Sequence, residues 1–159
     1  MVFHKIICGM VMVIALSGCL NKSSNPTAPA PTTVVYQGML YDSLLAAMFA
    51  SLQLNYSGSQ YRYTLTGNNT FKVDENIGMG WTSPSGEEGT YVLNGLQYSF
   101  TPTIDRMDDQ ATHLMVPTDS LRPVYSGTVS NDTLTITNFI NIENVKSQRN
   151  LGTLRLKKQ

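Results

Sequence analysis

From Tyr56 onward, the chain is a series of short segments that alternate between apolar and polar residues, with turn residues between them. A period of two residues is typical of β-strands that bury one face. The alternation is clearest in four segments: Tyr61–Thr66, Thr70–Asp74, Gly89–Thr101 and Pro123–Phe139. The side chains expected to point inward include Tyr61, Tyr63, Leu65, Phe71, Val73, Leu134, Ile136 and Phe139. This pattern restricts the domain to a mainly β, antiparallel fold.

Turn residues divide the longer segments into hairpins. Asn94-Gly95 separates two alternating runs and predicts a two-residue type I′ turn, because both residue types tolerate positive φ angles. Ser130 to Asp132 predicts a second hairpin turn. Further strands are expected at 34–40, 77–82, 112–116 and 151–157. Polar segments are expected at 83–88 and 140–150, and a longer acidic loop at 102–110.

One segment has a helical period instead. In residues 42–54 the large apolar side chains fall at 44, 45, 48, 49 and 52, and β-branched residues are nearly absent. Asp42 or Ser43 is available as the N-cap. We therefore predict one substantial helix, which could close one end of the domain.

Roughly nine or ten strands with one helix suit two architectures. Antiparallel sheets of this size avoid open edges by closing into a barrel or by stacking as a sandwich. We predict a meander that closes into a barrel, with a β-sandwich as the alternative.

The N-terminus is typical of a secretory signal peptide. Lys5 precedes an apolar run, Ile6 to Leu16, which is too short to span a bilayer as a stable helix. Small residues, Ser17 and Gly18, then precede Cys19. The sequence Leu16-Ser17-Gly18-Cys19 resembles the lipobox of bacterial lipoproteins, and we expect residues 1–18 to be removed.

The lipobox resemblance implies that Cys19 carries a diacylglyceryl group on its sulfur and usually an acyl chain on its new amino terminus. Two or three chains would anchor the protein stably to a membrane. In the enterobacterial sorting rule for lipoproteins, Asp directly after this Cys retains a protein at the inner membrane. Leu20 occupies that position here, which favours the outer membrane of a Gram-negative cell.

Residues 19–33 predict a tether, because Pro, Ser, Thr and Ala dominate there without apolar periodicity. Extended at ~3.1 Å per residue, this tether would reach roughly 40 Å. The single folded domain is expected at 34–159. Cys8 leaves with the signal and Cys19 is acylated, so no disulfide or free thiol is expected in that domain.

Charge excludes one class of partner. The chain has 11 Lys and Arg against 11 Asp and Glu, and loss of Lys5 leaves 10 against 11. A near-neutral chain lacks the basic footprint of a nucleic-acid-binding protein. The membrane is the expected partner, reached through acylated Cys19.

Two pairs of strands also carry a resemblance to a known fold family. Gly89-Thr90-Tyr91 followed by Leu96 to Phe100, and Tyr125 to Val129 followed by Leu134-Thr135-Ile136, are similar to strands of the small lipocalin-like (calycin) domains of bacterial surface lipoproteins. The resemblance covers residues 60–157 and implies a β-barrel that binds a small ligand.

The aromatic residues are the best candidates for a binding site. Tyrosines and Trp81 would line an apolar pocket with a few hydroxyl groups, as ligand sites usually do. Within such a pocket we expect Trp81, Tyr63, Phe71 and Tyr98 to contact the ligand, and Trp81 in particular because Gly80 beside it permits close approach. The same side chains could instead fill a small barrel completely.

Catalytic and metal sites are not indicated. His113 is the only histidine of the mature chain, and one histidine without cysteine cannot form a zinc site. The acidic run Asp105 to Asp109 lacks EF-hand spacing and is expected to be a solvated loop, while Glu87-Glu88 is expected at a hairpin tip. We therefore predict no catalytic residue, no metal and no cofactor.

Two functions remain open. The first is a lipid-anchored lipocalin-like barrel that binds a small apolar or amphipathic molecule. The second is a non-enzymatic structural or interaction lipoprotein, with a solid core, that contacts another envelope protein or a polysaccharide.

Overall fold

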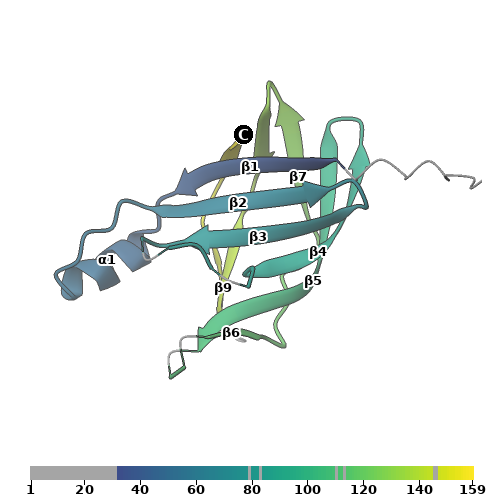
Figure 1. Ribbon diagram of the computed structural model, residues 1–159. Coiled ribbons are helices and arrows are strands. Elements are labelled where there is room, and N and C mark those ends of the chain that lie inside the picture. Colours follow the sequence, from purple (N-terminus) through teal and green to yellow (C-terminus); the bar gives the residue numbers. More distant parts are fainter. Residues whose placement is uncertain (1–31, 79, 83, 110, 113, 145–146) are drawn as a thin grey trace, which may run out of the picture. The chain divides into compact units, whose positions relative to one another are not determined.

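A computed structural model describes residues 32–78, 80–82, 84–109, 111–112, 114–144 and 147–159 (Figure 1). The predicted signal peptide, Cys19, most of the tether, Met79 and His113 lie outside these residues. The elements are β1 (Thr33–Leu40), α1 (Ser43–Ser51), β2 (Ser59–Thr66), β3 (Thr70–Asn76), β4 (Glu87–Asn94), β5 (Gln97–Asp109), β6 (Leu114–Pro117), β7 (Tyr125–Ser130), β8 (Thr133–Ile136), β9 (Ile140–Asn144), β10 (Ser147–Asn150) and β11 (Leu154–Lys158).

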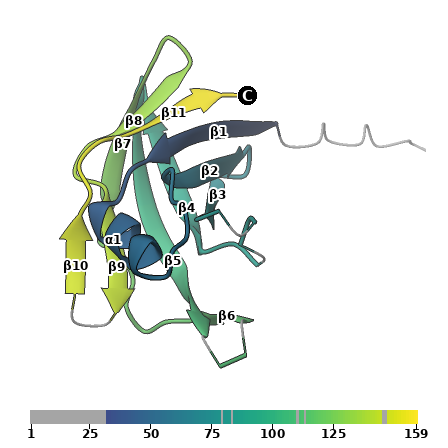
Figure 2. The ribbon, with the colours of Figure 1, turned by 90° about the vertical axis from the view of Figure 1, so that its left-hand side faces the viewer.

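Eight antiparallel strands close into a barrel, as predicted. Along the sheet they follow the order β1, β2, β3, β4, β5, β7, β8 and β11, and β11 pairs with β1 to complete the ring. Each strand therefore lies beside its neighbour along the chain, apart from two excursions. Strand β6 extends β5 on its outer edge, and β9 and β10 form a separate hairpin (Figure 2).

The two ends of the barrel differ. The end at which β1 begins, here named the entry rim, also carries three turns, which connect β2 to β3, β4 to β5 and β7 to β8. The opposite end, the far rim, is where β1 ends and the chain continues into α1 (Figure 1).

The core is built from alternating inward residues, and every inward position named from the sequence is buried. Phe100 is fully buried at its centre, with ring centroids 5.7 Å from Tyr63, 5.1 Å from Phe71 and 5.6 Å from Tyr98. These distances lie within the range in which aromatic rings attract one another. Aromatic packing therefore fills this part of the barrel.

The β4–β5 turn differs from the prediction by one residue. Asn94 pairs with Gln97, so the turn residues are Gly95 and Leu96, and of these only Gly95 has a positive φ (61°). Glycine at the first turn position with positive φ is typical of type II′ rather than type I′. Both central residues of the β7–β8 turn, Asn131 and Asp132, have positive φ, as a type I′ turn requires.

Two other predictions were wrong, and one segment, described from the sequence only as polar, contains strands. Residues 102–109 continue β5 instead of forming a loop, because they pair first with β4 and then with β6. The described residues of 77–82 form no strand; Asn76 Oδ1 instead accepts the backbone N–H groups of Gly78 and Gly80, which turns the chain. Residues 140–150 contain the β9–β10 hairpin.

Helix α1 is confirmed but is shorter than 42–54 and is not buried along its apolar stripe. Asp42 caps it, because its Oδ1 accepts the N–H groups of Leu44 and Leu45. Phe49, the buried residue of the helix, packs on Tyr56 with centroids 5.3 Å apart. Leu44, Met48 and Leu52 remain 53%, 46% and 61% exposed.

Candidate functional site

A group of polar side chains lies inside the barrel, toward the far rim. Glu87 opens β4 and Asp105 lies in β5, and the two residues are paired across the strands. Directly paired residues project to the same face of a sheet, and only 2% of Glu87 and 7% of Asp105 are exposed. Two carboxyl groups therefore face each other in the barrel interior.

A β-bulge explains why Asp105 points inward. In β5, Tyr98, Phe100 and Pro102 are buried, and strict alternation would place Ile104 inside next. Gly89 pairs with Pro102 but Glu88 pairs with Ile104, so Thr103 is an additional residue in β5. One additional residue reverses the side-chain alternation, which turns Asp105 inward.

Arg122, in the link between β6 and β7, supplies the opposing charge. Its side chain is only 10% exposed, its Nε lies 3.2 Å from Glu87 Oε2, and its guanidinium lies 4.7 Å from the centre of the Phe139 ring. The Arg122 Nε–H is not aligned for a hydrogen bond to Glu87 Oε2, so the contact is mainly electrostatic. Burial alone would lower the pKa of Arg122, but the negative charge of Glu87 reverses this effect and raises it.

Two tyrosines extend the network toward the core. Tyr125 donates its hydroxyl hydrogen to Glu87 Oε1 at 2.6 Å, and its oxygen lies 3.1 Å from the Tyr63 hydroxyl. Burial raises the pKa of both tyrosines well above its usual range, so both hydroxyls stay protonated. Tyr63 thus has a structural hydrogen bond as well as a place in the aromatic core.

Two buried carboxyl groups in this region, those of Asp105 and Glu75, have raised pKa values. Burial raises the pKa of Asp105 to about 6, with Glu87 adding to the effect and Arg122 opposing it. Burial also raises the pKa of Glu75, which accepts a hydrogen bond from the Tyr61 hydroxyl at 2.9 Å. Asp105 and Glu75 therefore bind protons more readily than exposed carboxylates do.

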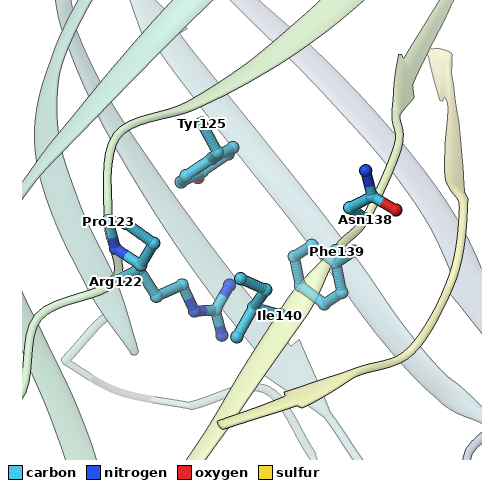
Figure 3. A pocket seen from close by; sticks show the side chains of 6 residues that line it. All are labelled: Arg122, Pro123, Tyr125, Asn138, Phe139 and Ile140. Carbon is cyan, nitrogen blue, oxygen red and sulfur yellow. The ribbon is translucent and has the colours of Figure 1, made fainter.

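A small pocket borders Arg122. Its lining residues are Arg122, Pro123, Tyr125, Asn138, Phe139 and Ile140 (Figure 3). Its volume of about 10 Å³ is close to the room that one water molecule needs. Ligand sites usually measure about 300–1,000 Å³, so this pocket is far too small for an organic ligand.

The four predicted ligand-binding residues do not come together. Tyr63, Phe71 and Tyr98 belong to one aromatic core cluster, in which their rings surround Phe100. The Arg62 guanidinium lies over the Trp81 ring, with its central carbon 4.4 Å from the centre of that ring. Because Arg62 alternates with the buried Tyr61 and Tyr63 on β2, Trp81 covers the outer face of the barrel.

The sequence did not identify the ionic network. Glu87 had been expected at a hairpin tip and Asp105 in a solvated loop, and both are buried instead. Arg122 had not been singled out. The only signal available was the continued alternation from Tyr98 through Pro102, which indicates a longer strand β5.

The described residues contain no group of three His, Cys, Asp or Glu side chains arranged to hold a metal ion. In the same part of the chain, no helix is long and apolar enough to cross a membrane. Comparisons with models of protein families, with curated proteins and with solved structures found no match.

Proposed function

We propose that this chain is a lipid-anchored protein of the cell envelope, in the outer membrane if the source is Gram-negative, whose barrel is a non-enzymatic interaction module. Its partner would be another envelope protein with an apolar groove. The observation that carries this proposal is the exposed apolar stripe on α1, formed by Leu44, Met48 and Leu52.

The packing of the interior favours this function over ligand transport. Tyr63, Phe71 and Tyr98 would have to separate from Phe100 to admit an apolar molecule. Opening a packed aromatic cluster loses both buried area and ring contacts. Binding at the outer surface requires neither change.

Helix α1 is well suited to fit into a groove. Leu44, Met48 and Leu52 recur every four residues, the spacing by which an amphipathic helix is recognised in an apolar groove. Tyr41, which precedes the helix and is 61% exposed, extends the apolar surface on the N-terminal side of α1.

Two contacts hold the helix in place. Asp42 both caps α1 and forms an ion pair with Arg149, with Arg149 Nη1 2.7 Å from Asp42 Oδ1. Phe49 packs on Tyr56 at the other end. A helix fixed before binding loses less conformational entropy when it docks.

The lipobox Leu16-Ser17-Gly18-Cys19 supports the anchored location. The closed antiparallel barrel is compatible with a lipocalin-like domain, and we propose membership of that class on the strand motifs alone. Binding of a polysaccharide, rather than a protein, is an outcome that the experiment below distinguishes.

A photo-crosslinking amino acid placed at Met48 in living cells tests the interaction. We expect one discrete protein adduct, and a reciprocal adduct when the identified partner carries the crosslinker. The same label at Lys72, whose exposed side chain lies on β3, is the matched control and should give no adduct.

A second variant makes the test specific. Leu44→Ser combined with Leu52→Ser should abolish the adduct at Met48, because it removes the apolar stripe without touching the core. If Met48 gives no protein adduct, or gives the same pattern as Lys72, the proposed interaction is wrong. An adduct that contains only carbohydrate would assign the surface to a polysaccharide.

A further inference from the structure

The chain enters the barrel on the same rim as its most exposed apolar hairpin, on the opposite side of the ring of strands. Thr33 begins β1 at the entry rim and pairs with Thr66, the last residue of β2. The chain turns there into β3, whose first residue, Thr70, pairs with Thr90 of β4. Strand β4 then continues past β3 into the β4–β5 turn, which lies on the same rim as the start of β1 (Figure 1).

Three large apolar side chains are exposed at that hairpin. Val92 is 58% exposed, Leu93 48% and Leu96 66%, and we name them the hairpin tip. No residue of β3 pairs with Val92 or Leu93, because the β3–β4 ladder ends at Thr90. Consecutive strand residues point to opposite faces, so the exposure of both shows that β4 extends beyond the end of β3, while β7 still flanks β5 on the other side of the hairpin.

We propose that the hairpin tip inserts into the surface of the bilayer that holds the acyl chains of Cys19. This inference rests on the lipid anchor of the proposed function. The predicted tether of residues 19–33 ends at Thr33, on the same rim as the hairpin tip. With a reach of roughly 40 Å at most, the tether keeps this rim near the membrane at a high effective concentration.

The chemistry at the tip suits a lipid surface. The free energy falls when leucine and valine side chains leave water for the apolar side of the interface. Lys157 and Lys158 lie on the same rim, where long lysine side chains can reach lipid phosphates, but Asp132 beside them offsets part of this charge. The contact is therefore mainly apolar and should form on zwitterionic lipid.

This arrangement sets the direction in which α1 faces relative to the bilayer. Strand β1 runs from the entry rim to the far rim over eight residues, about 26 Å of extended chain, and α1 follows directly. With the hairpin tip in the lipid, α1 faces away from the bilayer. Membrane contact and protein binding would then use opposite ends of one barrel.

An environment-sensitive nitrobenzoxadiazole probe on a single cysteine tests the insertion. In the mature lipoprotein Cys19 is acylated and Cys8 is absent, so Leu96→Cys creates the one reactive thiol. The full-length lipidated protein is reconstituted into phosphatidylcholine vesicles that contain a spin-labelled phospholipid. Leu44→Cys on α1, also exposed and apolar, is the matched control.

At position 96 we expect a blue-shifted emission, loss of most of the fluorescence to the spin-labelled lipid, and protection from iodide. At position 44 we expect emission typical of water, little loss of fluorescence to the spin-labelled lipid, and free access of iodide. Equal iodide access at both positions would overturn the insertion. Changing Val92 and Leu93 to serine should return the probe at 96 to water.

Intact mass separates the two proposals. If Cys19 carries acyl chains and the probe at 96 stays in water, only the insertion is wrong and the anchor stands. If Cys19 carries no acyl chain, the anchor is wrong and the insertion is overturned with it. Absence of a crosslinked partner at Met48 would affect the interaction alone.

Discussion

At the scale of single residues, the positive charge of Arg122 compensates the buried negative charge of the barrel interior. Glu87 and Asp105 face each other across β4 and β5, and two buried carboxylates repel strongly without a cation. Arg122 lies 3.2 Å from Glu87 and also lowers the pKa of Asp105. Its guanidinium, stacked on Phe139, therefore compensates a charge pair that would otherwise oppose folding.

We predict that Arg122→Met destabilises the protein by about 3–5 kcal/mol, the usual cost of removing one partner from a buried ion pair. Urea unfolding at neutral pH, followed by circular dichroism, measures the effect. Adding Glu87→Gln to the variant should recover much of the loss, because the uncompensated charge disappears.

Lys72→Met is the control for this prediction. Lys72 Nζ lies 3.9 Å from Glu88 Oε1 and the lysine side chain is 58% exposed, so solvent screens that pair and its loss should cost no more than about 1 kcal/mol. Equal costs for Lys72 and Arg122 would contradict the special role of the buried network.

Asp105 makes stability depend on pH. Its folded pKa of about 6 lies above the ordinary value of 3.8, so the folded state binds the proton more tightly than the unfolded state does. Stability from this group is full below about pH 4 and falls as pH rises through about 6, by at most about 3 kcal/mol because solvent screens part of the effect. Asp105→Asn should remove that decline.

The measurement is the free energy of unfolding of both proteins between pH 4 and pH 7. The Asn side chain can still accept the Arg106 N–H, which Asp105 Oδ1 accepts at 2.9 Å, so the fold should be kept. Glu75, whose pKa burial also raises, contributes a decline of the same sign to both proteins. A constant difference between the two proteins across this range would show that Asp105 does not titrate as expected.

At the scale of elements, the bulge in β5 is the feature that builds the network. Strands β4 and β5 shift register between Glu88 and Gly89, where Thr103 is the additional residue. Gly89 permits the close approach, because a Cβ there would overlap the Thr101 carbonyl oxygen and lie 2.7 Å from Phe71 Cε1. Gly89 thus permits the register shift, and the register shift sets which residues of β5 face inward.

Gly89→Ala should therefore cost about 1–3 kcal/mol, as overpacking of a close contact usually does. Gly86→Ala is a matched control three residues earlier. Its added Cβ would lie 3.5 Å from the Val73 carbonyl oxygen, an ordinary contact, and should change stability by less than about 0.5 kcal/mol. Thermal unfolding of both variants measures the difference, and similar melting temperatures would show that the register shift tolerates a side chain.

The same bulge limits what the sequence could predict. Where alternation is regular, as in 61–66 and 70–74, strands and inward faces were predicted correctly, because the period of two alone sets the face. In β5 the additional residue reversed the alternation, and the acidic run Asp105 to Asp109 read as a loop. Arg122 lies outside any periodic segment, so only the three-dimensional arrangement reveals its partners.

The helix shows a second limit of prediction. Its apolar stripe and two N-cap candidates, Asp42 and Ser43, were visible in the sequence; the helix is confirmed, and Asp42 is the residue that caps it. The helix could have closed one end of the barrel, but Phe49 is its one buried residue and packs on Tyr56. A helical apolar face indicates that something covers it, and this can be a partner rather than the same chain.

At the scale of the whole molecule, the packed core is the reason that both contacts we propose use the outer surface of the barrel. The aromatic cluster around Phe100 occupies the core and the ionic network of Glu87, Asp105 and Arg122 lies toward the far rim. The hairpin tip and α1 then lie at opposite rims, where we propose a lipid contact and a protein contact. Such a module needs firm attachment, because three partly exposed apolar side chains bind a bilayer only weakly.

Cys19→Ser should for this reason move the protein from the membrane fraction to the soluble fraction. The hairpin tip remains in this variant, but without the acyl chains its contact with lipid is too weak to survive washing. Cys8→Ser is the matched control, since Cys8 is predicted to leave with the signal peptide, and it should stay membrane-bound. Fractionation with and without detergent, combined with intact mass, gives the result. If the Cys19→Ser protein still needs detergent for release, a contact other than the acyl chains holds it, and the anchor does not depend on Cys19.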